Sequence, residues 1–265
     1  MKFYSVNEKE KRLDVFNERW YPNADRTKWY RNITTILCTI NKGYQYDEWL
    51  KNVGHNSEII VDRAGKLGTV VHSLIERTLL GDKVTFNGLI AYGEQQATSY
   101  WERYLVWCKF WKEFNETYEV EYQSDGVEHV ALSDKYSYGC TVDLIARIKD
   151  KKKKGEQLLV DIDWKTGNSI HDASDLQVVA GMKAIEEQTG NKFNKGLIVH
   201  MPFDKPNKKG YRIHEVENSD ELFNLVIATK KIYDYQNNGN DPKFLTYPIE
   251  VDLEYIKNNN IIEEK

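Results

Sequence analysis

The sequence has few of the residues and runs that mark membrane-spanning, disulfide-bonded or fibrous proteins. Its 265 residues include only three cysteines and five prolines. No stretch approaches the roughly 18 apolar residues of a membrane-spanning helix. The first residues lack the apolar core of a signal peptide. We therefore expect a protein that stays in the cytoplasm and has no membrane association.

The cysteines are scattered rather than paired. Cys38, Cys108 and Cys140 form no Cys-x-x-Cys motif, which argues against a zinc site or a cysteine-ligated cluster. An odd number at wide spacing is typical of free thiols in a reducing compartment. No iron–sulfur cluster is expected.

Charge of neither sign dominates. The 37 basic and 41 acidic residues give a net charge of −4, without the basic surplus typical of nucleic-acid-binding proteins. This balance does not exclude nucleic-acid binding, because a metal enzyme concentrates carboxylates in its own site. The hydrophobic share of 40% and the charged share of 29% fit an ordinary soluble globular protein.

The apolar pattern predicts one mixed α/β domain over residues 1–265. Apolar residues recur at helical spacing over 67–79 and over 89–114, which predicts a helical N-terminal part at about 1–115. From about 116 to 236 strands and helices alternate, which predicts a mixed central sheet flanked by helices. The other predicted elements are strands at 118–122, 127–132, 196–201 and 211–216 and helices at 46–53, 175–188 and 220–236.

Two segments near the N-terminus are ambiguous, and so is an aromatic stripe. Residues 1–31 show no clear period, and 32–40 is either a strand or the start of a buried helix. The second long helix carries aromatic residues on one face, which is more often core than a base-stacking platform. The stripe consists of Tyr100, Tyr104, Trp107, Trp111 and Phe114.

Residues 139–149 and 157–165 flank a charged turn and predict a β-hairpin. Pairing the last residue of the first strand with the first residue of the second places Asp143 opposite Asp163. Side chains alternate along a strand, so Asp163 and Lys165 share one face. Two acids and a lysine are therefore expected to converge in the sheet.

These residue types suit metal-assisted hydrolysis of a phosphodiester. Neighbouring carboxylates repel each other unless a proton or a cation neutralises them. Oxygen ligands favour Mg²⁺ or Mn²⁺. The lysine can orient or deprotonate an attacking water, and it can stabilise charge that develops on the phosphorus.

Several motifs occur in the same order as in a known nuclease family. They are Gly68–Glu76 (GTVVHSLIE), Gly139–Ile145 (GCTVDLI), Val160–Gly167 (VDIDWKTG) and Gln177, with a looser match of Ile33–Leu37 followed by Trp49. In this combination, over about 32–200, the chain resembles the PD-(D/E)xK nucleases. It is most similar to the RecB-type exonucleases and their phage and CRISPR-adaptation relatives.

The resemblance implies a restriction-endonuclease-like core and a set of site residues. It assigns metal ligation to His72, Asp143, Asp163 and the backbone carbonyl of Trp164, and catalysis to Asp143, Asp163, Lys165 and Gln177. The chain departs from the family where the usual Gln-x-x-x-Tyr has Gly181 instead of tyrosine. Several relatives carry a cysteine-bound iron–sulfur cluster, which these scattered cysteines cannot supply.

Each candidate also has a structural alternative. His72 and Glu76 are one helical turn apart and can form a solvent-facing pair; we favour a ligand role for His72 and an ion pair for Glu76. Glu128 is placed where relatives often carry a further acid, at a loose spacing. For Asp161 a salt bridge is favoured over an accessory catalytic role.

Gln177 and the basic residues leave alternatives open. Ser174 and Gln177 have the spacing of a helix capping box, which does not exclude a site role. Lys151–Lys154 at the hairpin tip is either a solvated turn, which we favour, or a phosphate contact. Arg63, Lys66 and Arg77 can line a DNA path.

The sequence thus predicts a metal-dependent DNA nuclease, an exonuclease in recombination, repair or DNA processing. The alternative is a catalytically inactive nucleic-acid-binding or assembly protein, and a third option is endonucleolytic cleavage. The complete set of Asp143, Asp163 and Lys165 argues against loss of activity, and His72 favours the exonuclease branch. The expected partner is single- or double-stranded DNA. A further partner, a recombinase or a single-strand annealing protein, stays open.

Overall fold

The structure is a computed structural model that describes residues 12–15, 18–153, 155–202, 207–237 and 251–258. Its strands are β1 (Leu13–Val15), β2 (Glu18–Pro22), β3 (Trp29–Asn32), β4 (Tyr118–Glu121), β5 (Val127–Ser133), β6 (Tyr138–Asp150), β7 (Leu158–Lys165), β8 (Lys195–His200) and β9 (Arg212–Glu217). Its helices are α1 (Ile33–Leu37), α2 (Tyr44–Val53), α3 (Asn56–Leu79), α4 (Glu94–Thr117), α5 (Asp172–Thr189), α6 (Asp220–Asn237) and α7 (Leu253–Asn258), with 3₁₀ turns η1 (Phe86–Tyr92) and η2 (Ser124–Gly126).

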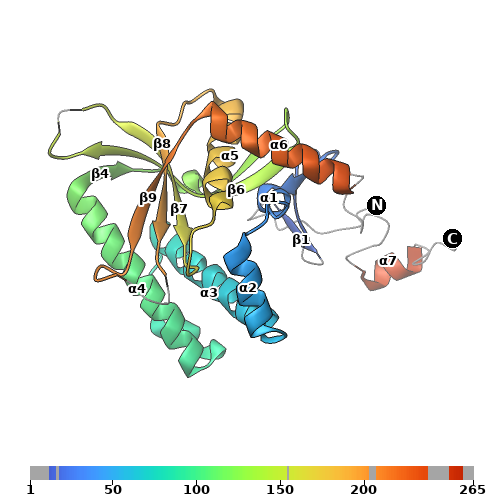
Figure 1. The fold of residues 1–265 in the computed structure, drawn as a ribbon, viewed down its shortest axis with the longest axis horizontal. Helices are drawn as coiled ribbons and strands as arrows, with labels where there is room; N and C mark the ends of the chain where they lie inside the picture. The colour runs from blue at the N-terminus through green and yellow to red at the C-terminus, as the bar shows by residue number, and fades with distance from the viewer. Residues whose placement is uncertain (1–11, 16–17, 154, 203–206, 238–250, 259–265) are drawn as a thin grey trace.

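A single mixed sheet organises these elements (Figure 1). Its strand order is β1-β2-β3-β6-β7-β8-β9, and β4 and β5 also pair with β6. The pairs β3–β6 and β7–β8 are parallel, and the remaining pairs are antiparallel. The predicted mixed α/β class, with a central mixed sheet flanked by helices, is confirmed.

The N-terminal strands were not predicted from the sequence. β1, β2 and β3 form an antiparallel unit that joins the sheet where Arg31 pairs with Tyr138. They are short, and the adjacent Trp20 and Tyr21 are both fully buried, so no polar–apolar alternation marks them. The predicted helical N-terminal part therefore begins only at Ile33.

The predicted helices are present, with one division. The helix predicted over 89–114 is a 3₁₀ turn, η1, followed by α4, because Gly93 between them has a φ of +86° that no continuous helix allows. The ambiguous segment at 32–40 is the short helix α1, whose first turn is capped by the Asn32 side chain.

The predicted hairpin has the predicted register. β6 and β7 are antiparallel, with Leu144 opposite Ile162 and Ile145 opposite Asp161. This register makes Asp143 and Asp163 the next pair along the hairpin. The two acids therefore lie side by side at the end of β7, where the chain leaves the sheet.

Two hydrophobic cores cover the two faces of the sheet. On one face, α3 and α4 pack against alternate residues of β7, and the ring of Trp107 lies edge-on to Trp164 with centroids 6.0 Å apart. On the other face, α1, α5 and α6 form the second core. The aromatic stripe of α4 belongs to the first core, as favoured. Across the described residues, every helix is too short or too polar to cross a bilayer.

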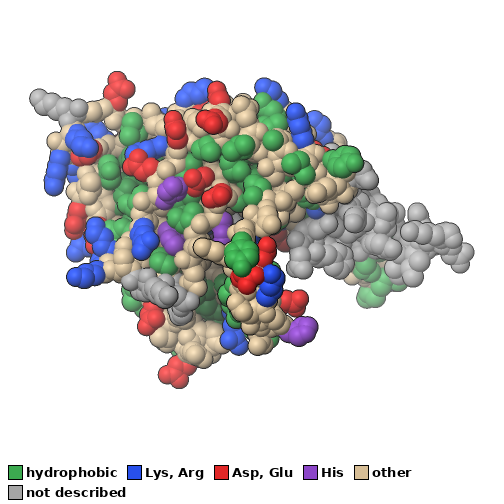
Figure 2. Space-filling view, viewed as in Figure 1, with side chains coloured by type: hydrophobic (Ala, Val, Ile, Leu, Met, Phe, Trp, Pro, Cys, Tyr) green, Lys and Arg blue, Asp and Glu red, His purple; other side chains and the backbone are tan. Residues whose placement is uncertain are grey.

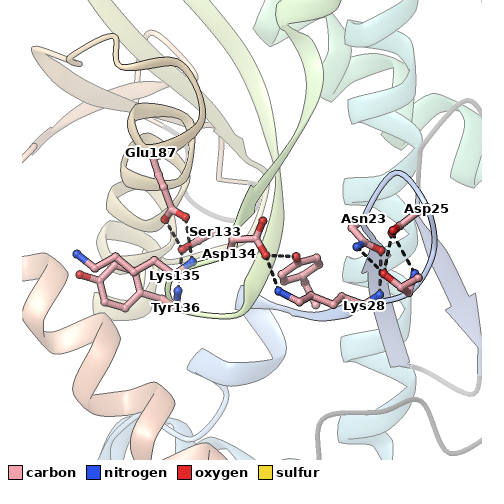
Figure 3. A network of polar contacts seen from close by, with 10 residues as sticks. Asn23, Asp25, Lys28, Ser133, Asp134, Lys135, Tyr136 and Glu187 are labelled. Atoms are coloured by element: carbon pink, nitrogen blue, oxygen red, sulfur yellow. Dashed lines mark hydrogen bonds and ion pairs between the residues drawn. The ribbon is translucent and has the colours of Figure 1, made fainter.

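Polar contacts fix the turn between β5 and β6 (Figure 3). Glu187 of α5 accepts hydrogen bonds from the Ser133 hydroxyl at 2.6 Å and from the Lys135 backbone N–H at 2.9 Å. Asp134 accepts from Lys28 at 3.2 Å and from the hydroxyl of Tyr30 at 2.5 Å. The turn that leads into β6 is thus held both by α5 and by the N-terminal segment that contains β3.

The N-terminal strands lie so close to β6 that Gly139 has no room for a side chain. A Cβ atom there would lie 2.6 Å from Cδ2 of Tyr21. We expect Gly139→Ala to lower the free energy of unfolding by about 1–3 kcal/mol, because overpacking forces Tyr21 to move. Urea unfolding measures the change. Gly155→Ala, where nothing lies within 4 Å, is the control and should shift stability by less than about 0.5 kcal/mol. Equal values for the two variants would contradict this packing.

Candidate metal centre

Three acids from neighbouring strands meet at one position of the sheet. In the β5–β6 pair, Val127 is opposite Leu144 and His129 is opposite Val142, which places Glu128 opposite Asp143. On the other side of β6, Asp163 is opposite Asp143 by the hairpin register. The carboxylates of β5, β6 and β7 therefore form a row across the sheet.

The strands bend at this row. Val142 packs into the core under α5, whereas Leu144 packs into the core under α4, although the two are an even number of residues apart. Opposite this break, Glu128 has a φ of +48°, a left-handed conformation that is unusual for a residue other than glycine. Such strain costs about 1–3 kcal/mol and is common at functional sites.

α3 brings His72 to the same row. Its neighbours Val71, Leu74 and Ile75 are buried in the core, which fixes the orientation of the helix. The imidazole Nε2 lies 2.9 Å from the backbone carbonyl oxygen of Trp164.

The other imidazole nitrogen of His72 faces two carboxylates. Nδ1 lies 3.4 Å from Oδ1 of Asp143 and 3.8 Å from Oε1 of Glu128. Asp143 also accepts a hydrogen bond of 2.8 Å from the backbone N–H of Trp164 through Oδ2. Asp143 therefore joins the hairpin to α3.

The charged groups of this cluster shift one another's pKa values. Burial alone lowers the pKa of His72, but Asp143 and then Glu128 outweigh burial and hold the pKa well above its ordinary value. Burial raises the pKa of Asp143, but His72 and Lys165 hold it below its ordinary value. Burial raises the pKa of Glu128, against the opposing effect of His72.

Asp163 and Lys165 form the second part of the site. Asp163 is 5% exposed, and its Oδ1 accepts a hydrogen bond of 2.8 Å from Nζ of Lys165. Among the described residues, the buried Oδ2 of Asp163 has no hydrogen-bond partner. A buried carboxylate oxygen without a donor is costly, and a bound cation would satisfy it.

Lys165 stays charged, and Asp163 titrates close to neutrality. Burial raises the pKa of Asp163 to about 6; Lys165 opposes this shift and Asp143 adds to it. Burial lowers the pKa of Lys165, but Asp163 and Asp143 outweigh burial and raise it. The lysine is thus a fixed positive charge beside two acids.

Gln177 contacts the site and does not form a capping box. α5 begins at Asp172, with His171 as its N-cap, so Gln177 lies beyond the N3 position expected from Ser174. Its Oε1 instead accepts a hydrogen bond of 3.2 Å from Nζ of Lys165. The capping-box alternative is wrong because the helix starts earlier than its sequence pattern indicates.

Asp161 does not form the salt bridge favoured from the sequence. It is 2% exposed beneath α5, and within the described part of the chain it makes no ion pair, and its Oδ1 has no hydrogen-bond partner. Burial, Asp163 and Asp143 all raise its pKa well above the ordinary value. Lys165 opposes this shift, and Asp161 is therefore a buried acid beneath the site whose neutral form is favoured.

The missing tyrosine has a packing explanation. A Cβ atom at Gly181 would lie 2.8 Å from Cγ2 of Val142 and 3.2 Å from Oδ2 of Asp161. The helix therefore lies on the β6–β7 hairpin too closely for any side chain at this position. One turn earlier, the same close approach brings Gln177 to Lys165.

The remaining predicted residues lie at different distances from the site. Glu76 is near enough for its charge to raise the pKa of Glu128. Lys66 pairs with Asp62 at 2.8 Å, and Arg77 lies 3.4 Å from Asp82. These pairs occupy two of the three basic groups that were candidates for a DNA path.

Arg63, which precedes Lys66 on α3, is exposed. At the hairpin tip, Lys151 donates to the backbone carbonyl of Asn115 at 2.6 Å, and Lys153 lies 3.7 Å from Asp150. Residue 154 lies outside the described residues. Lys151 and Lys153 are thus held by local contacts, and the choice between a solvated turn and a phosphate contact stays a prediction.

Glu128 is the residue that sequence reasoning underrated. Its spacing from Asp143 carries no motif. The signal that identifies it is the register of the β5–β6 hairpin, because pairing Ser133 with Tyr138 across the turn already places Glu128 opposite Asp143.

The donor set fits a divalent cation. One ligand atom each from His72, Glu128 and Asp143 lie within 4.8 Å of one another. Neighbouring ligands of an octahedral ion at about 2.1 Å lie about 3 Å apart. Because a carbonyl oxygen can only accept, Nε2–H of His72 donates to the Trp164 carbonyl at 2.9 Å, which leaves Nδ1, the nitrogen that faces Asp143 and Glu128, as the imidazole ligand atom. A buried His/carboxylate cluster of this kind could bind a metal.

Comparison with known proteins assigns this chain to no family. No protein-family model matches this chain, and no curated protein matches it. Among solved structures, the chain is similar to a "putative exonuclease" from Eubacterium rectale, with 12% identity, a TM-score of 0.40 and coverage of 77% of each chain. It is also similar to the protein SSO0001, with 13% identity, a TM-score of 0.31 and coverage of 57% of this chain and 64% of that one. At these TM-scores neither similarity carries an argument about function.

The close approach of α5 predicts that Gly181 tolerates no side chain. We expect Gly181→Ala to lower the free energy of unfolding by about 1–3 kcal/mol, because its Cβ atom would overlap Val142. Gly65→Ala is the matched control, since Gly65 is also within a helix but has nothing within 4 Å. That variant should be neutral or more stable by up to about 1 kcal/mol. A neutral Gly181→Ala in urea unfolding would refute the packing explanation.

Metal binding should compete with protons. Asp163, with a pKa of about 6, and His72, with a raised pKa, must both lose protons to act as ligands. We expect the affinity for Mn²⁺ to fall as pH decreases from about 8 to about 5, by roughly tenfold per pH unit for each competing proton. Calorimetric titration in buffers of different ionisation enthalpy counts the protons released. An affinity that is independent of pH would exclude these ligands.

Proposed function

We propose that residues 1–265 act as one metal-dependent DNA nuclease domain that hydrolyses phosphodiester bonds, with exonucleolytic activity. The observation that carries this proposal is the convergence of Asp143, Asp163 and Lys165 with His72. Strands β5, β6 and β7 bring the carboxylates to one position of the sheet. Helix α3, which is far away in the sequence, brings His72 to the same position. Such groups are costly to bury and are retained where a cation or a charged substrate needs them.

Mg²⁺ or Mn²⁺ is the metal that we propose. The ligands would be His72 through Nδ1, Asp143 and Asp163, with Glu128 as an additional acid. The Trp164 carbonyl would join them only with its contact to His72 Nε2 broken. Carboxylate and carbonyl oxygens suit both ions, and the imidazole nitrogen shifts the preference towards Mn²⁺. When bound, such an ion lowers the pKa of a water molecule and polarises the phosphodiester.

The protein's own groups have separate tasks. Lys165, held by Asp163 and Gln177 at 2.8 and 3.2 Å, presents a fixed positive charge where negative charge develops on the phosphate oxygens. The Asp143 carboxylate is held by the Trp164 backbone N–H, which keeps it oriented before substrate binds. Trp164 itself is buried in the core, so the backbone between Asp163 and Lys165 is rigid.

DNA digestion with and without metal tests the proposal. Linear end-labelled DNA and circular DNA, each single- and double-stranded, would be incubated with Mg²⁺, Mn²⁺ or EDTA. Loss of linear but not circular DNA, only with metal, supports an exonuclease. Cleavage of circles indicates an endonuclease. DNA binding without cleavage in either metal favours the alternative of an inactive nucleic-acid-binding protein.

Substitution of the central residues should abolish cleavage without unfolding the protein. We expect Asp163→Ala and Lys165→Ala to reduce the rate of DNA cleavage by about 100-fold or more, because each removes a charge from the reacting centre. DNA binding should survive in Lys165→Ala. Lys149→Ala, an exposed lysine on β6, is the matched control and should cleave normally. Far-ultraviolet circular dichroism checks the fold. Cleavage at the wild-type rate by either site variant would rule out this site.

A further inference from the structure

The sheet places basic residues beside the site, in register with Lys165. In the β7–β8 pair, Lys165 is opposite His200, and in the β8–β9 pair His200 is opposite Arg212. Two residues earlier on β7, Asp163 is opposite Ile198, and Ile198 is in turn opposite His214. The row that contains Lys165 therefore continues across β8 to Arg212 on the edge strand.

All three side chains of this row project from the same face. Ile198 on β8 and Val216 on β9 both belong to the core beneath α5. Side chains alternate along a strand, so His200 shares the face of Ile198, and Arg212 shares the face of Val216. Since neighbouring strands are about 4.8 Å apart, Arg212 lies about 10 Å from Lys165 across the sheet.

The basic groups near this row differ in what they already bind. His200 is 6% exposed, and its Nε2 lies 2.7 Å from the Gly167 carbonyl oxygen. His214 lies 3.0 Å from both carboxylate oxygens of Asp175, at the start of α5. Both histidines therefore have structural partners, and the Asp175 carboxylate is already paired.

Arg212 is different. It is exposed, and within the described part of the chain its guanidinium makes no hydrogen bond or ion pair. Figure 2 shows Lys or Arg side chains next to His side chains over the region where β9 is seen in Figure 1. Lys165 and His200 are the last residues of their strands and Arg212 is the first of its strand, so the row lies at the edge of the sheet where the chain leaves it.

We propose that Arg212 binds a backbone phosphate of the nucleic acid strand that is cleaved at Lys165. The strand would then run from the metal centre across the ends of β8 and β9. This inference rests on the proposed nuclease function and adds to it the direction in which the substrate leaves the site. At about 10 Å, Arg212 reaches a phosphate a few nucleotides from the scissile one. It is a positioning residue, since it does not touch the reacting atoms.

An exposed arginine on an edge strand has another use. Charged side chains there prevent the edge from pairing with another chain. That role predicts no dependence of DNA binding on Arg212, whereas a phosphate contact contributes to the salt dependence of binding. The two explanations therefore differ in a measurable quantity.

The binding test uses a fluorescent single-stranded oligonucleotide and the full chain. Anisotropy titrations over a range of NaCl concentrations, in EDTA and in Ca²⁺, give affinity and salt slope. We expect Arg212→Gln to weaken binding roughly tenfold and to reduce the slope by about 0.7, the contribution of one phosphate contact on a single strand. Arg212→Lys should restore most of the slope. Arg147→Gln, an exposed arginine on β6 at the other end of the sheet, is the matched control and should change neither.

A kinetic test separates this inference from the proposed function. With metal, Arg212→Gln should raise KM for the oligonucleotide several-fold and leave kcat nearly unchanged, because the contact lies outside the reacting centre. Hydrolysis of bis(p-nitrophenyl) phosphate, which has no neighbouring phosphate, should not change. If the wild-type chain cleaves nothing but binding depends on Arg212, the nuclease proposal fails and the phosphate contact stands. If Arg212→Gln behaves as Arg147→Gln does, or if the wild-type chain binds no DNA, the inference is overturned.

Discussion

The Asp143 carboxylate is the contact on which the rest of the site depends. One oxygen accepts the backbone N–H of Trp164 on the neighbouring strand, and the other faces His72 on α3. These contacts join a hairpin and a helix that are far apart in the sequence. Without Asp143, His72 would lie beside Glu128 alone, and the strand end at Trp164 would lose its side-chain acceptor. The bend of β5 and β6 at this row gives Asp143 access to both partners.

The charges around Asp143 are balanced only in part. His72 and Lys165 offset the negative charge of the nearby acids, and burial and then Asp163 raise the pKa of Asp161 well above its ordinary value. One buried oxygen of Asp161 and one of Asp163 still lack a hydrogen-bond partner among the described residues. Unsatisfied buried oxygens are destabilising unless a further positive charge is present. A cluster built in this way is suited to a divalent cation, and it ties the stability of the core to the state of the site.

The arrangement of α5 shows how packing determines chemistry. Gly181 and Gly196 allow this helix to lie directly on the sheet, and a side chain at either position would overlap Val142 or Val178. Because the helix lies so close, Gln177 reaches Lys165. The position that usually carries a tyrosine in the family that the chain resembles is here used for close contact.

The sequence by itself determined the local parts of this protein: the long helices, the β6–β7 hairpin and its register, and the facing pair Asp143 and Asp163. These follow from periodicity, which acts between residues that are close along the chain. The tertiary structure alone decided that β1, β2 and β3 join the sheet and that Arg212 shares a row with Lys165. The position of these residues depends on which strands pair and on how closely α5 packs on the sheet. Both are set by long-range packing, which leaves no period in the sequence.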